Sequence, residues 1–123
     1  MDSLIIEPTN DTPHVLFDAD KGILEISKKS LPENALVFYH PLFDWIYKYI
    51  KNPQAETTIN FKLDFFTTSS AKQITKMLFL FEKLSDISNV YIKWYYKKRD
   101  IDMYSAGLKY SKLTDLKFEL VEH

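Results

Sequence analysis

The stretch INFKLDFFTTSSAKQITKMLFLFEKL, residues 59–84, decides the fold of this chain. Its first half alternates apolar and polar residues, which predicts a strand with one apolar face. The apolar positions of this strand are Ile59, Phe61, Leu63 and Phe65. The apolar spacing then changes to three and four, which is typical of one face of a helix. This second set consists of Ala71, Ile74, Met77, Leu78, Phe81 and Leu84. The sequence therefore predicts a strand that turns directly into a long amphipathic helix.

Four consecutive hydroxyl residues, Thr67–Ser70, lie where the spacing changes. Ser70 followed by Gln73 matches a capping box, in which two side chains satisfy the exposed amides of a first helical turn. Thr68 is the rival capping residue. We therefore expect an accessible turn at the end of a strand, with a helix that begins between residues 69 and 71.

These hydroxyls have two interpretations. Serine and threonine are good helix caps, and this explanation is favoured by chemistry alone. The alternative is that one hydroxyl accepts a phosphoryl group, because a helix N-terminus offers free N–H groups and the positive end of a dipole. One cap needs one hydroxyl, so capping leaves three of the four unexplained.

Composition limits the classes of function. The 123 residues are the size of one domain, 1–123, and nine Phe, eight Tyr and two Trp supply a core. Two glycines are too few for a Gly-rich phosphate loop or a dinucleotide fingerprint. The absence of cysteine excludes disulfides, thiolate zinc sites and cysteine nucleophiles. A net charge of −1 gives no general attraction to nucleic acid or membranes. With no signal-peptide pattern and no long apolar run, we expect a cytoplasmic protein.

The rest of the chain predicts a mixed α/β fold. Before the central stretch we expect a short strand or arm at 3–7, a hairpin of strands 14–17 and 23–27, and a helix over 33–51. Ser30 is the possible cap of that helix, and Pro41 predicts a kink or a restart within it. The central strand covers 56–66. After the central helix we expect a strand at 90–96, a short helix at 102–108 with Gly107 near its end, and a strand over 116–120.

Strand, helix and strand from 56 to 96 form a βαβ unit, whose strands should pair in parallel. The leading hairpin and the final strand complete a mixed sheet, with helices on one or both faces.

Other chemical candidates are weak. His14, His40 and His123 share no metal-ligand spacing, and no clustered ligands predict a cofactor or a tightly bound metal. Asp100 and Asp102 fit a solvated turn better than a metal pair. The basic residues 97–99 after an aromatic strand indicate a protein-contact surface, since the chain lacks the basic balance of nucleic-acid binders. No nucleophile elbow is present, so we expect no enzyme activity.

Several motifs resemble a known family. These are Ser30–Ala35 (SLPENA), Phe38-Tyr39, Trp45, Phe65–Lys72 (FFTTSSAK) and Trp94–Tyr96 (WYY). In this order they resemble the SiaC family of regulatory phosphoproteins over almost the whole chain. This chain differs from the usual family pattern in having Thr67 in place of an asparagine, and Lys29 and Leu31 in place of a glycine and a tyrosine.

The resemblance implies a fold similar to the STAS domain and a non-enzymatic role in signalling. It implies that Thr68 is the phosphorylation site, with Thr67, Ser69, Ser70 and Lys72 as its neighbours. A serine/threonine kinase would phosphorylate Thr68 and a PP2C-type phosphatase would reverse this. The unmodified form would bind and activate a diguanylate cyclase, which raises cyclic-di-GMP. The alternative is a STAS-like module that binds a small ligand or nucleotide.

Overall fold

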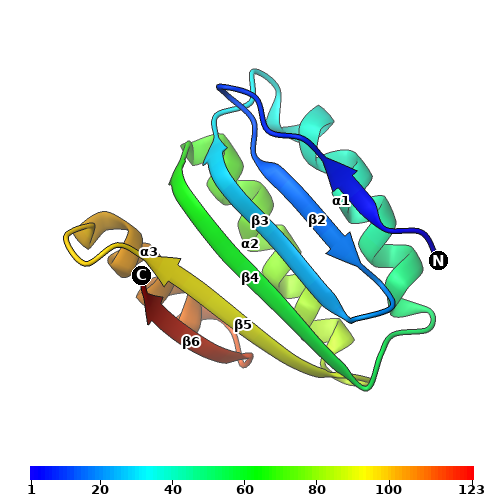
Figure 1. Ribbon diagram of the computed structural model, residues 1–123. Coiled ribbons are helices and arrows are strands. Elements are labelled where there is room, and N and C mark those ends of the chain that lie inside the picture. Colours follow the sequence, from blue (N-terminus) through cyan, green and yellow to red (C-terminus); the bar gives the residue numbers. More distant parts are fainter.

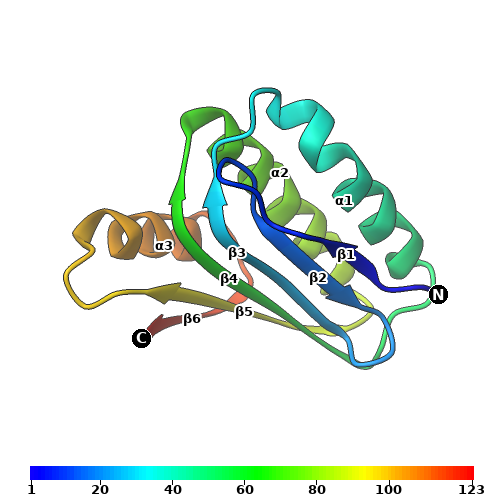
Figure 2. The ribbon, with the colours of Figure 1, turned by 45° about the horizontal axis from the view of Figure 1, so that its top comes forward.

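The computed structural model describes residues 1–123 as one sheet with all three helices on the same face (Figures 1 and 2). In chain order the elements are β1 (Leu4–Ile6), β2 (His14–Asp18), β3 (Ile23–Ser30), α1 (Ala35–Ile50), β4 (Glu56–Phe66), α2 (Thr68–Leu84), β5 (Asn89–Tyr96), α3 (Ile101–Leu113) and β6 (Lys117–Glu122). None of the helices is both long and apolar enough to span a membrane.

The six strands lie in the sheet in their chain order, and the two termini lie near opposite edges (Figure 1). The first three strands pair antiparallel, and β3 to β6 pair in parallel. Each parallel connection contains one helix, as parallel strands require. The predicted hairpin, βαβ unit and mixed α/β sheet are therefore confirmed.

The core fills the space between the sheet and the helices, and contains 26 buried apolar residues. Trp94 of β5 is fully buried and donates its indole N–H to the Met103 carbonyl of α3, at 3.0 Å. Gly107, in the middle of α3, packs against the same ring. A side chain at this position would overlap Trp94. The prediction of a short helix that ends near Gly107 was wrong: this glycine permits close packing and does not end the helix.

The end of β4 departs from simple alternation. Its pairing with β3 shifts between Lys28 and Lys29, so that Asp64 is skipped in the register. After this bulge Phe66 packs against Trp94 at a centroid distance of 6.0 Å, whereas Phe65 is 54% exposed. The prediction that Phe65 shares the buried face of Ile59 was wrong, because a bulge changes the side to which later side chains point.

The first helix also differs from expectation. Asn34 caps α1 by accepting the Val37 amide N–H at 3.2 Å. Ser30 is instead the last residue of β3 and is fully buried. The helix continues through Pro41 without a restart. Pro41 has no N–H to donate to the carbonyl of Val37, four residues earlier. Val37 is exposed, so water can hydrogen-bond to that carbonyl.

Candidate functional site

The hydroxyl segment lies where β4 ends and α2 begins. Thr67 is the N-cap of α2, and its Oγ1 accepts the amide N–H of Ser70 at 3.2 Å. The helix begins at Thr68, one residue earlier than predicted. The capping box of Ser70 with Gln73 and the alternative cap at Thr68 were both wrong, since Ser70 and Gln73 are buried inside the first turns.

The four hydroxyls have different surroundings. Ser70 is fully buried and Thr67 is half-buried, whereas Thr68 and Ser69 are exposed. The Ser69 hydroxyl lies 3.1 Å from Thr67 Oγ1. Thr68 takes part in no side-chain hydrogen bond. Of the four predicted candidates, Thr68 alone is both accessible and without a hydrogen-bond partner.

A chain of buried hydroxyls fixes the start of α2 to the rest of the fold. Ser30 Oγ lies 2.7 Å from the Tyr39 hydroxyl and 2.9 Å from Ser70 Oγ. Ser70 Oγ donates to the Ser30 carbonyl at 3.0 Å. One arrangement of protons satisfies every donor: Tyr39 donates to Ser30 Oγ, Ser30 Oγ donates to Ser70 Oγ, and Ser70 donates to the carbonyl. We call this set, Ser30, Tyr39 and Ser70, the hydroxyl relay.

The relay joins three elements, because its residues come from β3, α1 and α2. The Thr67 amide donates to the Ser30 carbonyl at 3.1 Å and so extends the pairing of β3 with β4. Burial raises the pKa of the Tyr39 hydroxyl, an effect that its hydrogen bond to Ser30 partly opposes. The tyrosine therefore stays protonated and able to donate at neutral pH.

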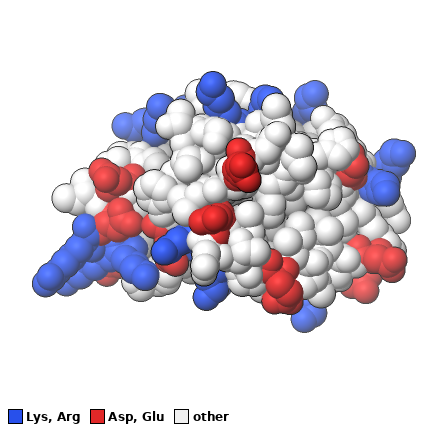
Figure 3. Space-filling view, turned by 90° about the horizontal axis from the view of Figure 1, so that it is seen from above, with Lys and Arg blue, Asp and Glu red and all other residues white.

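A groove opens beside the exposed hydroxyls, between the first turns of α1 and α2. Its volume is about 340 Å³, and its lining includes Leu36, Ser69, Lys72 and Lys76. Figure 3 views the molecule from this end and shows basic side chains along the upper margin, on the side of the helices. The sequence pointed to Lys72 but not to Leu36 or Lys76. Lys72 and Lys76 are four residues apart, and this spacing could have predicted that they lie on the same face of the helix.

The other candidates serve different purposes. Asp100 is the N-cap of α3 and accepts the Met103 amide at 2.9 Å, so it is more than a residue of a solvated turn. His40 pairs with Asp44 on the exposed side of α1, at 3.3 Å. His14 and His123 line one depression on the open face of the sheet. No three residues among the histidines and carboxylates are grouped as a metal ion would require.

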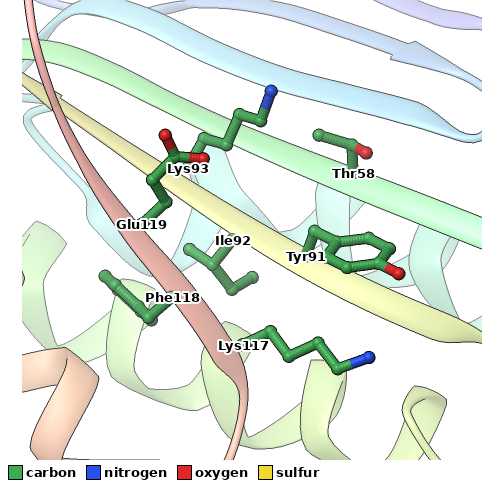
Figure 4. A pocket seen from close by; sticks show the side chains of 7 residues that line it. All are labelled: Thr58, Tyr91, Ile92, Lys93, Lys117, Phe118 and Glu119. Carbon is green, nitrogen blue, oxygen red and sulfur yellow. The ribbon is translucent and has the colours of Figure 1, made fainter.

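The open face of the sheet also carries a depression of about 410 Å³ between β4, β5 and β6. In Figure 4, Lys93 and Glu119 stand on the outer side of the strands, whereas Ile92 and Phe118 point toward the helices. Lys117 Nζ lies 5.0 Å from the centre of the Tyr91 ring. Small-molecule sites are usually enclosed apolar cavities with a few converging polar groups, whereas this depression lies open on the sheet and four of its seven lining residues are polar or charged.

Comparisons with known proteins identify a family and a fold. The model of the SiaC family, described as regulatory phosphoproteins, matches residues 6–123. An uncharacterized protein of Pseudomonas aeruginosa strain UCBPP-PA14 is 28% identical over 101 residues, which cover 81% of this chain and 80% of that protein.

Solved structures share the fold. Apo-SiaC from Pseudomonas aeruginosa superposes with a TM-score of 0.91 at 24% identity, over 98% of this chain and 99% of that one. A structure of the diguanylate cyclase SiaD in complex with its activator SiaC, from the same organism, matches equally well, with a TM-score of 0.91, 24% identity and the same coverage. The six-stranded sheet and three helices described above are therefore those of a known fold.

Proposed function

This chain belongs to the SiaC family of regulatory phosphoproteins, and from this premise we propose that it is a non-enzymatic signalling adaptor switched by reversible phosphorylation of Thr68. The unphosphorylated form binds and activates a diguanylate cyclase and so raises cyclic-di-GMP. A serine/threonine kinase adds the phosphate and a PP2C-type phosphatase removes it. The protein acts in the cytoplasm as a single domain of residues 1–123.

One observation carries the choice of Thr68. It is the exposed hydroxyl of the segment that has no hydrogen-bond partner, so a kinase can reach it without breaking the structure. Thr67 is committed to capping α2, and Ser70 is buried in the hydroxyl relay. Ser69 is accessible but lies within hydrogen-bonding distance of Thr67.

The helix start suits a phosphate. Thr68 and Ser69 are the first two residues of α2, so their amides have no acceptor within the helix. Such amides and the positive end of the dipole favour an anion. A phosphoryl group adds about 1.5 to 2 negative charges and three acceptor oxygens. We expect the modified domain to stay folded while its surface charge changes sharply.

The choice of partner rests on the family and on the solved complex. SiaC of Pseudomonas aeruginosa is described as the activator of the diguanylate cyclase SiaD. Two exposed apolar residues support a protein contact at this end of the molecule: Leu36, which lines a groove together with Ser69, and Phe65, three residues before Thr68. An anion placed on such a contact disturbs it by repulsion and desolvation.

Phosphorylation is tested by mass spectrometry of the intact protein after expression with kinases of the same organism. Wild type should gain one phosphate, and Thr68→Ala should gain none. Ser69→Ala is the matched control, because it removes the other exposed hydroxyl. If Thr68→Ala still gains a full phosphate, the acceptor is a neighbouring hydroxyl.

Activation is tested by the synthesis of cyclic-di-GMP with purified diguanylate cyclases of the same organism. Unmodified protein and Thr68→Ala should stimulate one of them. The phosphorylated protein should not, and Thr68→Glu should stimulate it less, because glutamate has about half the charge of a phosphate and a different shape. Equal stimulation by the unmodified and phosphorylated forms would show that phosphorylation is not the switch.

A further inference from the structure

We propose that the groove between the first turns of α1 and α2 is the docking surface for an acidic segment of the effector that carries an apolar side chain. This inference rests on the function proposed above and names the chemistry of the partner's contact. It concerns the groove lined by Leu36, Ser69, Lys72 and Lys76, which we call the α1–α2 groove.

The charge of the α1–α2 groove favours an acidic partner. Lys72 and Lys76 stand one turn apart on α2, both exposed, and neither ammonium lies within 4.0 Å of a carboxylate. Two other lysines of the chain are paired, Lys62 with Glu25 at 3.0 Å and Lys97 with Asp64 at 3.7 Å. Glu33 is the single acidic residue of the groove. Two unpaired lysines against one carboxylate leave a positive charge that a partner's carboxylates can meet.

The wall of the groove formed by α1 is apolar and exposed. Leu36 lines the groove and is 63% exposed, and its neighbour Val37 in the same first turn is 68% exposed, although both are large apolar residues. They gain nothing for the fold in this position, because their side chains do not reach the core. Exposed apolar groups rimmed by charges are typical of protein contact sites. An apolar side chain of the partner would remove them from water.

The position of the groove connects it to the switch. Ser69 lines the groove, and Thr68 is its neighbour at the start of α2. Lys72 follows Thr68 by four residues, which places the two side chains one turn apart on the helix. A phosphate on Thr68 would repel an acidic segment and would also pair with Lys72. One added group would thus remove the attraction without any change of fold.

The test is calorimetric titration of the full chain with the full-length diguanylate cyclase of the same organism that it activates. Lys72→Glu and Lys76→Glu should each raise Kd at least about tenfold, because they put like charges face to face. Lys83→Glu is the matched control, an exposed lysine in the last turn of the same helix. It should change Kd by less than about twofold, since a charge outside the contact has little effect.

The apolar part of the proposal has its own pair of variants. Leu36→Ala should raise Kd, whereas Ile87→Ala should not, although Ile87 is 59% exposed and equally apolar. Thermal melts of all variants should match wild type, because every substituted side chain is exposed. The switch mechanism adds a further requirement: phosphorylation should raise Kd by a smaller factor in Lys72→Glu than in wild type, since both changes act on the same charge.

The outcomes separate the two proposals. If wild type binds a cyclase but Lys72→Glu and Lys76→Glu bind it as tightly, the docking surface lies elsewhere and the proposed function stands. If wild type binds no diguanylate cyclase of its organism, the proposed function fails, and this surface fails with it.

Discussion

Ser70→Ala tests whether the hydroxyl relay holds the start of α2. Ser70 has no exposed surface, and its Oγ lies 2.9 Å from Ser30 Oγ and 3.0 Å from the Ser30 carbonyl. Truncation removes a hydrogen bond worth about 1 kcal/mol and leaves the Ser30 hydroxyl without its acceptor, which costs about 1–3 kcal/mol when buried. We therefore expect Ser70→Ala to lower the free energy of unfolding by about 2–4 kcal/mol. The control, Ser69→Ala, is exposed and should change it by less than about 0.5 kcal/mol.

The assay is urea unfolding followed by tryptophan fluorescence, since Trp45 and Trp94 are both buried. The midpoint should move while the slope stays constant, because a local hydrogen bond changes stability and not the surface exposed on unfolding. Tyr39→Phe combined with Ser70→Ala should show a coupling of at least about 0.5 kcal/mol, as members of one network do. A loss for Ser70→Ala no larger than that for Ser69→Ala, or full additivity in the double variant, would refute the relay.

Three further predictions follow from the packing. Gly107→Ala should destabilise the fold by about 1–3 kcal/mol in urea unfolding, because the added methyl would lie 2.7 Å from Leu120 and would also overlap Trp94. Lys28→Gly should raise the unfolding midpoint by the equivalent of about 0.5–1 kcal/mol, since Lys28 has a φ of 75° and glycine removes the left-handed strain at some cost in chain entropy. Because burial raises the pKa of Tyr39 above its ordinary value of 10.0, its contribution to stability is complete below that pH and is lost as the pH rises through the higher folded pKa. Tyr39→Phe should therefore weaken the fall of stability with alkali, measured by unfolding at rising pH with phenolate absorbance as the titration readout.

The sequence predicted the features that arise from local periodicity. The strand predicted over 56–66 has these bounds in the structure, and the next stripe of apolar residues is the buried face of α2. Order of elements and pairing direction follow from connection lengths, because a two-strand hairpin needs only a short turn and a parallel pair needs a crossover. The mixed sheet and its βαβ unit could therefore be predicted from the sequence.

What the sequence could not supply depends on contacts between distant residues. Ser30 and Ser70 are 40 residues apart. The local sequence around each serine predicts a helix cap, because short hydroxyl side chains readily form hydrogen bonds with nearby backbone amides. Only the approach of β3, α1 and α2 makes them partners of Tyr39. The bulge opposite Lys28 gave no signal in the sequence either, so Phe65 was placed on the buried face that Phe66 occupies. One shifted residue reverses which side chain reaches the core.

The surplus of hydroxyls, unexplained by the sequence, has a physical account in the structure. Thr67 caps the helix and Ser70 fixes it to β3 and α1, so two of the four hydroxyls hold the fold. Those two would be poor targets for modification, because a phosphate on either would break a bond that the fold needs. The Thr68 side chain makes no hydrogen bond, whereas its neighbours Thr67, Ser69 and Ser70 are hydrogen-bonded to one another. If Thr68 is the switch, modification changes the charge at the α1–α2 groove and leaves the hydrogen bonds beneath it intact. Under the proposed function, this separation of structural and exposed hydroxyls would let one segment form the start of the helix and also serve as a site of regulation.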